Sequence, residues 1–279
     1  MSPIRALLAA VWRRTPGRIG AIVLAAIILG AVAGPFWLAS PIEQPDIEHG
    51  GQPPSLAHPM GTDQLSRDVL ARVAGGARVS LAVATIAVMM SITLGALVGL
   101  VAGYKGGAID AIAMRLVDAA LAIPRLFLLL LLLALWERIP LAVFIIVVGA
   151  TGWFGTSRLV RAEVLRLRES EYVQAARALG SGGGRIMFRH LLPNAMGPLL
   201  VAATLGIGEV ILLEAGLSFL GLGIQPPTPS WGGMIFDAKE VLVTAPWASV
   251  FPALAIALTV LSANLIGDAL RDAVDPRGA

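Results

Sequence analysis

The sequence predicts an all-α, polytopic membrane protein with about six transmembrane helices. Of its 279 residues, 57% are hydrophobic and only 14% are charged, and the mean hydropathy is +0.81. Soluble domains carry about 25% charged residues, so this composition excludes an ordinary soluble globule. The apolar residues are also grouped into runs of about 18 or more, the length that a helix needs to cross a bilayer.

Six such runs follow one another along the chain, and four of them contain no Asp, Glu, Lys or Arg. A helix satisfies its own backbone hydrogen bonds, so each uncharged run fits a spanning helix in hydrocarbon. The third and fifth runs carry charges, and they span only if those charges face protein or a water-filled path. The six runs are residues 19–39, 79–103, 116–135, 139–157, 198–221 and 248–267.

The first run, 19–39, follows a basic segment, 1–18, that contains four arginines. Basic residues before an apolar run are also typical of a secretory signal peptide, whose apolar core has about 7 to 15 residues. The run has 21 uncharged residues and is therefore longer than such a core. We expect a retained transmembrane helix, preceded by a cytoplasmic N-terminal segment.

Residues 40–78 form a long extracytoplasmic connection with two parts. The first part is rich in Pro and Gly and should be irregular. In the second part Leu65, Val69 and Val73 recur at helical spacing beside Arg67 and Asp68. This pattern predicts a short amphipathic helix at the membrane surface, and a solvated helix without lipid contact is equally compatible with it.

Four charged residues fall within the expected spans: Asp118, Arg125, Glu209 and Glu214. Asp118 and Arg125 are two helical turns apart, so we expect them to share a face, with a kink at Pro124 between them. Charges in spans usually line a translocation path or pair with another group. They also pair with a partner subunit or extend to the membrane interface, and both interpretations stay open.

Residues 158–197, here called the coupling segment, are the most informative part of the chain. Strong helix formers run without Gly or Pro up to Gly180, which predicts a cytoplasmic helix that ends there. Three further glycines, 182–184, break the chain, and residues 185–192 start a second helix that Pro193 limits. The membrane does not require such a projecting pair of helices, so a docking element is indicated.

The coupling segment also has a simpler interpretation as a basic stretch held to anionic lipid. Its seven arginines fit that interpretation. The small pair Ala175 and Ala176 before the glycine-rich break does not follow from lipid binding, and it suits close approach to a protein groove. We therefore favour docking on a partner protein.

The positions of Lys and Arg predict that both termini lie in the cytoplasm. With that orientation, 15 of the 21 basic residues fall in the inner segments. The same rule accounts for the net charge of +3 and the pI near 9.9, which in a soluble protein would suggest nucleic acid. We expect contact with membrane lipid and no nucleic-acid partner.

No pattern in the chain indicates an enzyme or a metal site. There is no cysteine, and His49, His58 and His190 lack the spacing of metal ligands. A phosphate-binding loop needs Gly-Lys-Ser/Thr, but the only lysines, Lys105 and Lys239, follow Tyr and Ala. The chain is therefore expected to hold no nucleotide and no other cofactor of its own.

Within the coupling segment the sequence resembles the inner-membrane permeases of binding-protein-dependent ABC importers. Their signature is EAA, three residues, Gly, nine residues, a hydrophobic position, any residue, and Leu-Pro. Here Gln174 and His190 replace the glutamate and the apolar residue, while the spacing is kept throughout. The matching positions are Gln174, Ala175, Ala176, Gly180, His190, Leu192 and Pro193.

The resemblance extends over most of residues 58–277 and is closest to the C-type permeases of dipeptide, oligopeptide and nickel importers. The strings that carry it are HPMGTDQLSRDVLARVAGGARVSL, GLVAGYKGGAIDAIAMRLVDAALAIPRLFLLL, EAGLSFLGLGIQPPTPSWGGMI and NLIGDALRDAVDPR. Ser66 departs from that family, which usually has Gly before Arg-Asp. Because Glu214 lies in one of these strings, we expect it to pack or to pair with a subunit, and Glu209 is the better candidate for a path residue.

This resemblance implies the type I ABC importer permease fold in a bacterial or archaeal cytoplasmic membrane. Residues 79–279 would be the permease core, with five transmembrane helices and the coupling segment. The implied partners are a second, similar permease, two ATPase subunits that bind ATP and Mg²⁺, and an extracytoplasmic solute-binding protein. The proline-rich segment 222–247 would be a contact surface or gate for that binding protein, or a plain folded-back loop.

The function implied is half of a translocation pathway for di- or oligopeptides. Nickel or another small solute is the alternative cargo for the same fold. A further alternative is a secondary transporter that works without ATP and couples ions through Asp118, Glu209 or Glu214. It would transport as the purified chain alone.

Overall fold

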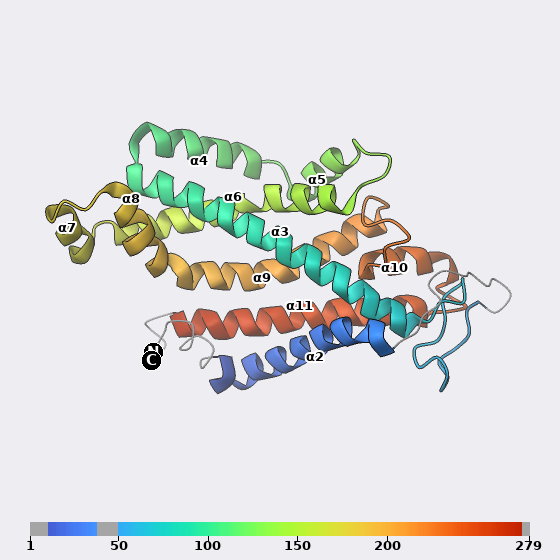
Figure 1. Cartoon of the computed structure of the whole chain (residues 1–279). Coiled ribbons are helices and arrows are strands. Elements are labelled where there is room, and N and C mark those ends of the chain that lie inside the picture. Colours follow the sequence, from blue (N-terminus) through green and yellow to red (C-terminus); the bar gives the residue numbers. More distant parts are fainter. Residues whose placement is uncertain (1–10, 38–49, 275–279) are drawn as a thin grey trace.

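The computed structural model describes residues 11–37 and 50–274, and the regular elements of that part of the chain are all helical (Figure 1). A single isolated bridge pairs Thr62 with Asp68. The predicted first span, 19–39, ends at Ala39, which lies outside the described residues. The first ten residues of the predicted N-terminal segment, including Arg5, lie outside them as well. The elements are α2 (Thr15–Trp37), α3 (Val69–Lys105), α4 (Gly107–Leu121), α5 (Arg125–Leu133), α6 (Leu141–Leu167), α7 (Glu171–Ala178), α8 (Gly183–Arg185), η1 (Ile186–Leu191), α9 (Leu192–Phe219), α10 (Trp231–Asp237), η2 (Ala238–Val241) and α11 (Trp247–Val274).

Five helices of the described chain are long and apolar enough to cross a membrane, and a bent pair adds a sixth if it is one span. The bent pair is α4 and α5, whose axes differ by 82°. The break lies at Ala122–Pro124, because proline has no backbone N–H and disfavours a helical residue before it. The predicted number of about six spans is confirmed, and the expected kink at Pro124 is a full break in the helix.

The long helices run side by side, with the connections gathered at the two ends of the bundle (Figure 1). One end, here called the α7 end, holds α7, α8, the start of α2 and the ends of α3, α6 and α11. The other, the α10 end, holds α10, residues 50–68 and the connection from α5 to α6. The segments expected on one side of the membrane therefore lie at one end, and which end faces the cytoplasm stays a prediction.

The closest helix pair, α3 and α6, is brought together by glycines spaced four residues apart on α3. An added Cβ at Gly99 would lie 2.9 Å from the Cβ of Val160 and would also collide with the carbonyl oxygen of Ser157. Gly95 and Gly103, one turn to either side, also lie against α6, with the nearest α6 atom 2.6 Å and 3.0 Å from an added Cβ, respectively. Small residues at this spacing let two backbones approach closely, and this is how helices associate without a hydrophobic driving force in lipid.

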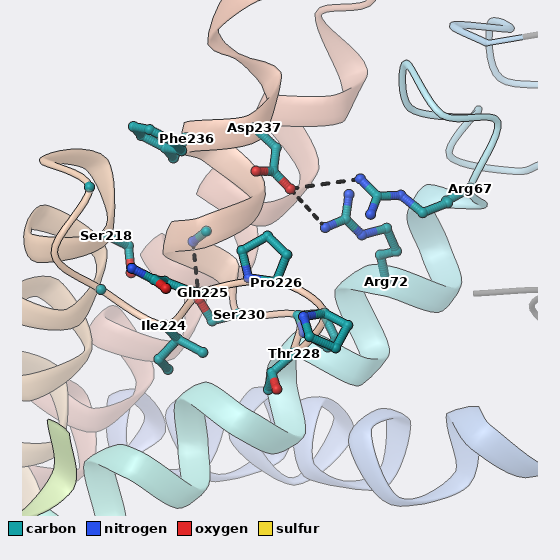
Figure 2. Close-up of a pocket in the computed structure, with 15 residues that line it drawn as sticks. Arg67, Arg72, Ser218, Ile224, Gln225, Pro226, Thr228, Ser230, Phe236 and Asp237 are labelled. Atoms are coloured by element: carbon teal, nitrogen blue, oxygen red, sulfur yellow. Dashed lines mark hydrogen bonds and ion pairs between the residues drawn. The ribbon is translucent and has the colours of Figure 1, made fainter. Parts of the chain in front are cut away.

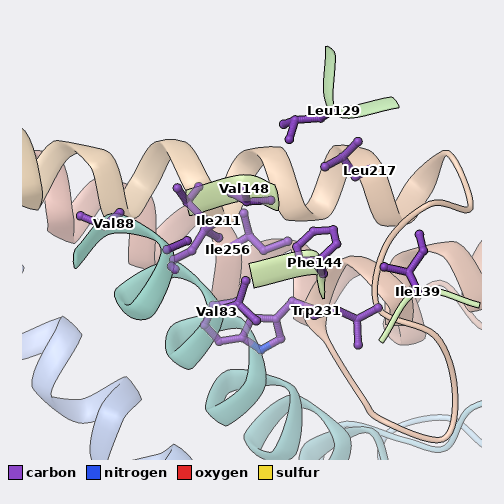
Figure 3. Packing of buried hydrophobic residues seen from close by; sticks show 14 of the residues in the cluster. Val83, Val88, Leu129, Ile139, Phe144, Val148, Ile211, Leu217, Trp231 and Ile256 are labelled. Carbon is purple, nitrogen blue, oxygen red and sulfur yellow. The ribbon is translucent and has the colours of Figure 1, made fainter. Parts of the chain in front are cut away.

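The largest buried cluster lies between α3, α6, α9 and α10 (Figure 3). Its largest fully buried side chain is the indole of Trp231, which lies beside Val83 and Phe144. The Trp231 Nε1 donates a hydrogen bond of 3.0 Å to the carbonyl of Val73 on α3. The segment between the fifth and sixth spans therefore folds back and contributes a core residue.

The start of α3 differs from the short surface helix expected before the second predicted span. A single helix begins at Val69, capped by the Asp68 side chain, which accepts from the Ala71 N–H at 2.8 Å. Gly75 and Gly76 do not interrupt it. Pro229 packs against Gly75 and Trp231 packs against Gly76, so closely that an added Cβ would be crowded at either position. The amphipathic pattern thus belongs to the first turns of a long spanning helix, with one face against α10.

Candidate functional site

The coupling segment begins and ends inside long helices, and only its middle projects from the bundle. Residues 158–167 are the last turns of α6, and α9 begins at Leu192. The single helix expected up to Gly180 is interrupted after Leu167, where the Ser170 hydroxyl donates to the Leu167 carbonyl. A serine hydroxyl that bonds the preceding turn competes with helix continuation, which explains why α7 starts anew at Glu171.

The end of α7 at Gly180 agrees with the prediction and follows from its hydrogen bonds. Gly180 has φ +77°, a conformation that favours glycine. The Ser181 N–H donates to the Ala176 carbonyl at 3.0 Å, and the Gly180 N–H donates to the Arg177 carbonyl at 2.9 Å. These two bonds form a Schellman motif, which closes the helix and turns the chain towards α8.

Pro193 does not limit the second helix, contrary to the expectation. A turn of π-helix, η1, precedes it, and the Leu192 N–H donates to the Met187 carbonyl five residues back. Pro193 then occupies the first turn of α9. A backbone N–H in the first turn has no acceptor within the helix, so the N–H that proline lacks costs no intrahelical hydrogen bond. The chain therefore passes without interruption from the coupling segment into the fifth predicted span.

One face of the coupling segment is packed tightly onto three spanning helices. Val173, Ile186 and Leu191 are fully buried in a cluster with residues of α3, α6 and α9. The ring of Tyr104, at the end of α3, lies against Gly183, and the Arg177 guanidinium lies 5.5 Å from the ring centroid. α7 is therefore joined to the bundle through η1, which continues into α9, and through the contact of Arg177 with Tyr104 of α3.

The opposite face of α7 is exposed and partly apolar. Tyr172 and Leu179 are 42% and 87% exposed, and Ala175 lies between them on the same side of the helix. Ala176 is buried instead, so the two alanines of the motif have different roles. Among the other motif positions, Gln174, Gly180 and Pro193 are exposed, while His190 and Leu192 are partly buried.

Asp118 and Arg125 do not share a face, because the break at Pro124 places them on separate helices. Asp118 forms an ion pair with Arg158 on α6. Arg125 pairs with Glu209 on α9 at 2.6 Å and also donates to the Val148 carbonyl at 3.0 Å. Three of the four predicted intramembrane charges are thus paired within this chain, and Arg158 was not anticipated as a partner.

The Arg125–Glu209 pair lines a cavity of about 270 Å³ between α4, α5, α6 and α9. Gly152 on α6 provides the space, since a Cβ there would lie 2.8 Å from the Arg125 guanidinium. The Glu209 side chain is 62% exposed, although it lies in the middle of an apolar helix. An exposed charge pair at this depth needs a polar or protein neighbour beyond the chain itself.

Glu214 occupies the opposite kind of environment. Its carboxyl group is buried and accepts hydrogen bonds from the Ser218 hydroxyl at 2.8 Å and the Ser80 hydroxyl at 3.2 Å. The Ser80 oxygen accepts in turn from the Trp231 N–H at 3.2 Å. Glu214 therefore connects α3, α9 and the start of α10, and its role in this structure is in packing.

A second polar group, which sequence analysis did not single out, closes the α10 end (Figure 2). Asp237 reaches the guanidinium groups of Arg72 at 3.0 Å and Arg67 at 3.7 Å, and both arginines also pair with the buried Asp63. These four residues, here called the α10-end cluster, join residues 50–68 and α3 to α10. Arg67, Arg72 and Asp237 line a cavity of about 110 Å³ whose wall includes the proline-rich segment from Ile224 to Ser230.

Comparison with known proteins identifies the family. Residues 95–278 match the family model of the binding-protein-dependent transport system inner membrane component. The dipeptide transport system permease protein DppC of Alkalihalophilus pseudofirmus is 42% identical over 260 residues, which cover 93% of this chain and 85% of the relative. The oligopeptide transport system permease protein OppC of Bacillus subtilis is 39% identical over 93% of this chain and 85% of its own length. The glutathione transport system permease protein GsiD of Pectobacterium atrosepticum is 38% identical over 95% of this chain and 90% of its own length.

The match covers both sites described above, the coupling segment and the intramembrane charges of α4, α5 and α9. A family of this kind works with partner subunits and a binding protein, and its members are multi-pass proteins of the inner membrane. The chain belongs to the family of binding-protein-dependent transport system inner membrane components, permeases of transporters in which a separate subunit binds and hydrolyses ATP.

Proposed function

We propose that this chain forms half of the translocation pathway of an ATP-driven importer for di- or oligopeptides. The names of the relatives from Alkalihalophilus and Bacillus support a peptide cargo. The other half of the pathway is a second, similar permease, two ATPase subunits bind at the α7 end, and a solute-binding protein delivers the peptide at the α10 end. The abundance of Lys and Arg at the α7 end supports the assignment of that end, and of both termini, to the cytoplasm.

The observation that carries the proposal is the two-sided character of α7. Its outer face offers Tyr172, Ala175 and Leu179 to a partner, while its inner face packs on η1 through Val173 and reaches Tyr104 of α3 through Arg177. Exposed apolar side chains on successive turns of a helix fit a groove on another protein. Closure of the ATPase pair would move α7, and the helices joined to it would rock between inward and outward openings.

The Arg125–Glu209 cavity is the part of the pathway that this chain supplies. Residues of α4, α5, α6 and α9 line the cavity, and the exposed Glu209 pairs there with the partly buried Arg125 among mainly apolar residues. The second permease would cover this surface and leave a polar passage between the two chains. Asp118 and Arg158, also exposed and paired, would lie on the same interface.

The experiment that tests docking replaces Ala175 with Trp in the assembled transporter. Ala175 is exposed, so the permease should fold normally while the bulky side chain keeps the ATPase from its groove. Co-purification of the ATPase subunits and uptake of a labelled dipeptide should both fall severalfold. The uptake assay includes a longer peptide and Ni²⁺ as competitors, and only the peptide should compete if the cargo is a di- or oligopeptide.

Two controls separate docking from folding. Ala175→Ser keeps the side chain small and should behave as the wild type. Ala108→Trp adds the same bulk to an exposed site on α4 at the α7 end, outside the coupling segment and its α7 face, and should leave ATPase binding intact. Normal ATPase binding and normal uptake in Ala175→Trp would refute the docking role. Ala176→Trp is not a suitable test, because Ala176 is buried and the change would disturb the packing of α7.

A further inference from the structure

A groove between α2 and α3 is separate from the proposed pathway and from the coupling segment. Figure 1 shows the two helices diverging from the α10 end of the bundle. The groove between them measures about 460 Å³, and nine of its ten lining residues carry no charge. Leu24, Ile28, Ala31 and Val32 form one wall, Leu81, Ala82, Thr85 and Ile86 form the other, and Ile207 of α9 also lines the groove.

Arg78 is the tenth residue of this lining and its only charged one. Its side chain is exposed, and it has no hydrogen bond or ion pair with any residue in 11–37 or 50–274. Its neighbours Arg67 and Arg72 both have carboxylate partners in the α10-end cluster. A guanidinium group at the edge of the hydrocarbon is stabilised by a negative partner, which the described part of the chain does not provide.

The position of Arg78 along α3 corresponds to the membrane interface. Residues 79–104 contain no Asp, Glu, Lys or Arg, and Lys105 ends this uncharged stretch on the other side. A helix of that length spans about 39 Å, which exceeds the roughly 30 Å of the hydrocarbon core and so brings both flanking charges to the headgroup level. The groove runs from Arg78 towards the middle of the bilayer, because its α3 residues are one to two turns further along.

We propose that this groove binds one anionic phospholipid, with the phosphate group on Arg78 and an acyl chain between α2 and α3. A guanidinium group offers paired donors that match phosphate oxygens, and its stem covers the apolar surface beside it. The small side chains of Ala31 and Ala82 make room for the acyl chain. A transmembrane helix of another protein would need a carboxylate at the same depth as Arg78, whereas lipid phosphates are always present there.

The test uses the assembled transporter in nanodiscs that contain equal amounts of phosphatidylglycerol and phosphatidylcholine. Native mass spectrometry counts the lipids of each kind that stay bound. The wild type should retain phosphatidylglycerol in preference, and Arg78→Gln should reduce that preference about fivefold, which corresponds to the about 1 kcal/mol of one arginine near a charged membrane surface. Ala82→Phe fills the groove and should lower retention of both lipids.

Matched variants identify the site. Arg138→Gln removes another exposed arginine at the α10 end, one without a partner in the described chain, and should keep the lipid preference. Ala257→Phe adds the same bulk to an exposed site on α11 and should not change retention. Equal retention in wild type and in both groove variants would refute the proposal. So would a photo-reactive side chain at position 82 that cross-links to a polypeptide rather than to lipid.

Discussion

Two carboxyl groups on α9 show how position decides the role of the same chemical group. Glu209 and Glu214 are five residues apart, so they point to different sides of the helix. Glu214 faces α3 and α10, where serine hydroxyl groups donate to it, and Glu209 faces a cavity, where a guanidinium group meets it. The first is a packing element of the fold, and the second belongs to the proposed pathway.

We predict that Glu209→Gln lowers the rate of peptide uptake without loss of the folded permease. The amide keeps the size of the side chain but removes the charge that balances Arg125. Loss of one charge-assisted hydrogen bond, about 1.5 kcal/mol, would reduce the initial rate about tenfold if it is lost in full during transport. Vesicle uptake of a labelled dipeptide measures the rate, and the thermal unfolding temperature reports on the fold.

The fold should tolerate this change because Glu209 is 62% exposed and Arg125 keeps its bond to the Val148 carbonyl. Glu137→Gln is the matched control, since Glu137 is an exposed carboxylate between α5 and α6 that is not among the residues lining the Arg125–Glu209 cavity. Wild-type uptake in Glu209→Gln would return the pair to a purely structural role. If Glu209→Gln lowers the unfolding temperature but leaves uptake per folded molecule unchanged, the pair likewise has a purely structural role.

At the level of residues, the sequence predicted which positions are charged and which are small, but not how they pair. Arg125 and Glu209 are separated by 84 residues, and Asp118 and Arg158 by 40. No periodic pattern relates residues on different helices, so only the packing of α4, α5, α6 and α9 shows these partners. Asp63 and Asp237 were missed for the same reason, because they lie in loops and helix ends without a repeating pattern.

At the level of elements, the spacing of glycines on α3 explains its close contact with α6. We predict that Gly99→Ala destabilises the permease by about 1 to 3 kcal/mol, since an added methyl group in a tightly packed interface forces the helices apart. The methyl group would collide with the Ser157 carbonyl oxygen and lie 3.0 Å from the Arg161 nitrogen. Thermal unfolding of the detergent-solubilised transporter is the measurement.

Gly30→Ala is the control for this prediction. Gly30 lies within α2, and an added Cβ there would meet no atom within 4 Å. Because alanine is the better helix former, this variant should be as stable as the wild type or slightly more stable. If Gly99→Ala and Gly30→Ala unfold at the same temperature, the contact between α3 and α6 is looser than the structure indicates.

The helices themselves were largely predictable from hydrophobic length, whereas their breaks and joins were not. The uncharged runs at 79–103 and 139–157 became the cores of α3 and α6, but both helices continue well beyond them. Gly75 and Gly76 stay helical where Pro229 and Trp231, respectively, pack on them, and Pro193 is accommodated by the π-turn of η1. Tertiary contacts thus overrode the local signals of glycine and proline, and Ser170 made a break where the sequence pattern was continuous.

At the level of the whole molecule, α3 connects the two sites at which partners are expected. Its 37 residues extend over about 55 Å. Tyr104 and Gly103 contact the coupling segment at one end, where the Arg168 guanidinium donates to the Gly103 carbonyl at 3.1 Å. At the other end, Arg72 joins the α10-end cluster and Ser80 bonds the Trp231 N–H. A binding protein at the α10 end and an ATPase at the α7 end would therefore act on the same rigid helix.

This connection predicts that Asp237→Asn separates the two ends functionally. Arg67 and Arg72 would then share Asp63 alone, and the loss of a charged hydrogen bond, about 1.5 to 3 kcal/mol, would loosen α10 from α3. Peptide uptake and the stimulation of ATP hydrolysis by the binding protein should both decrease, while basal hydrolysis stays, because α7 and its packing lie at the opposite end. ATPase activity in vesicles, with and without the binding protein, measures the difference.

Glu240→Gln, which removes an exposed carboxylate three residues further on, should leave the stimulation unchanged. Full stimulation in Asp237→Asn would mean that α3 does not carry the signal from α10, and the connection would have to run through α9 or α11 instead.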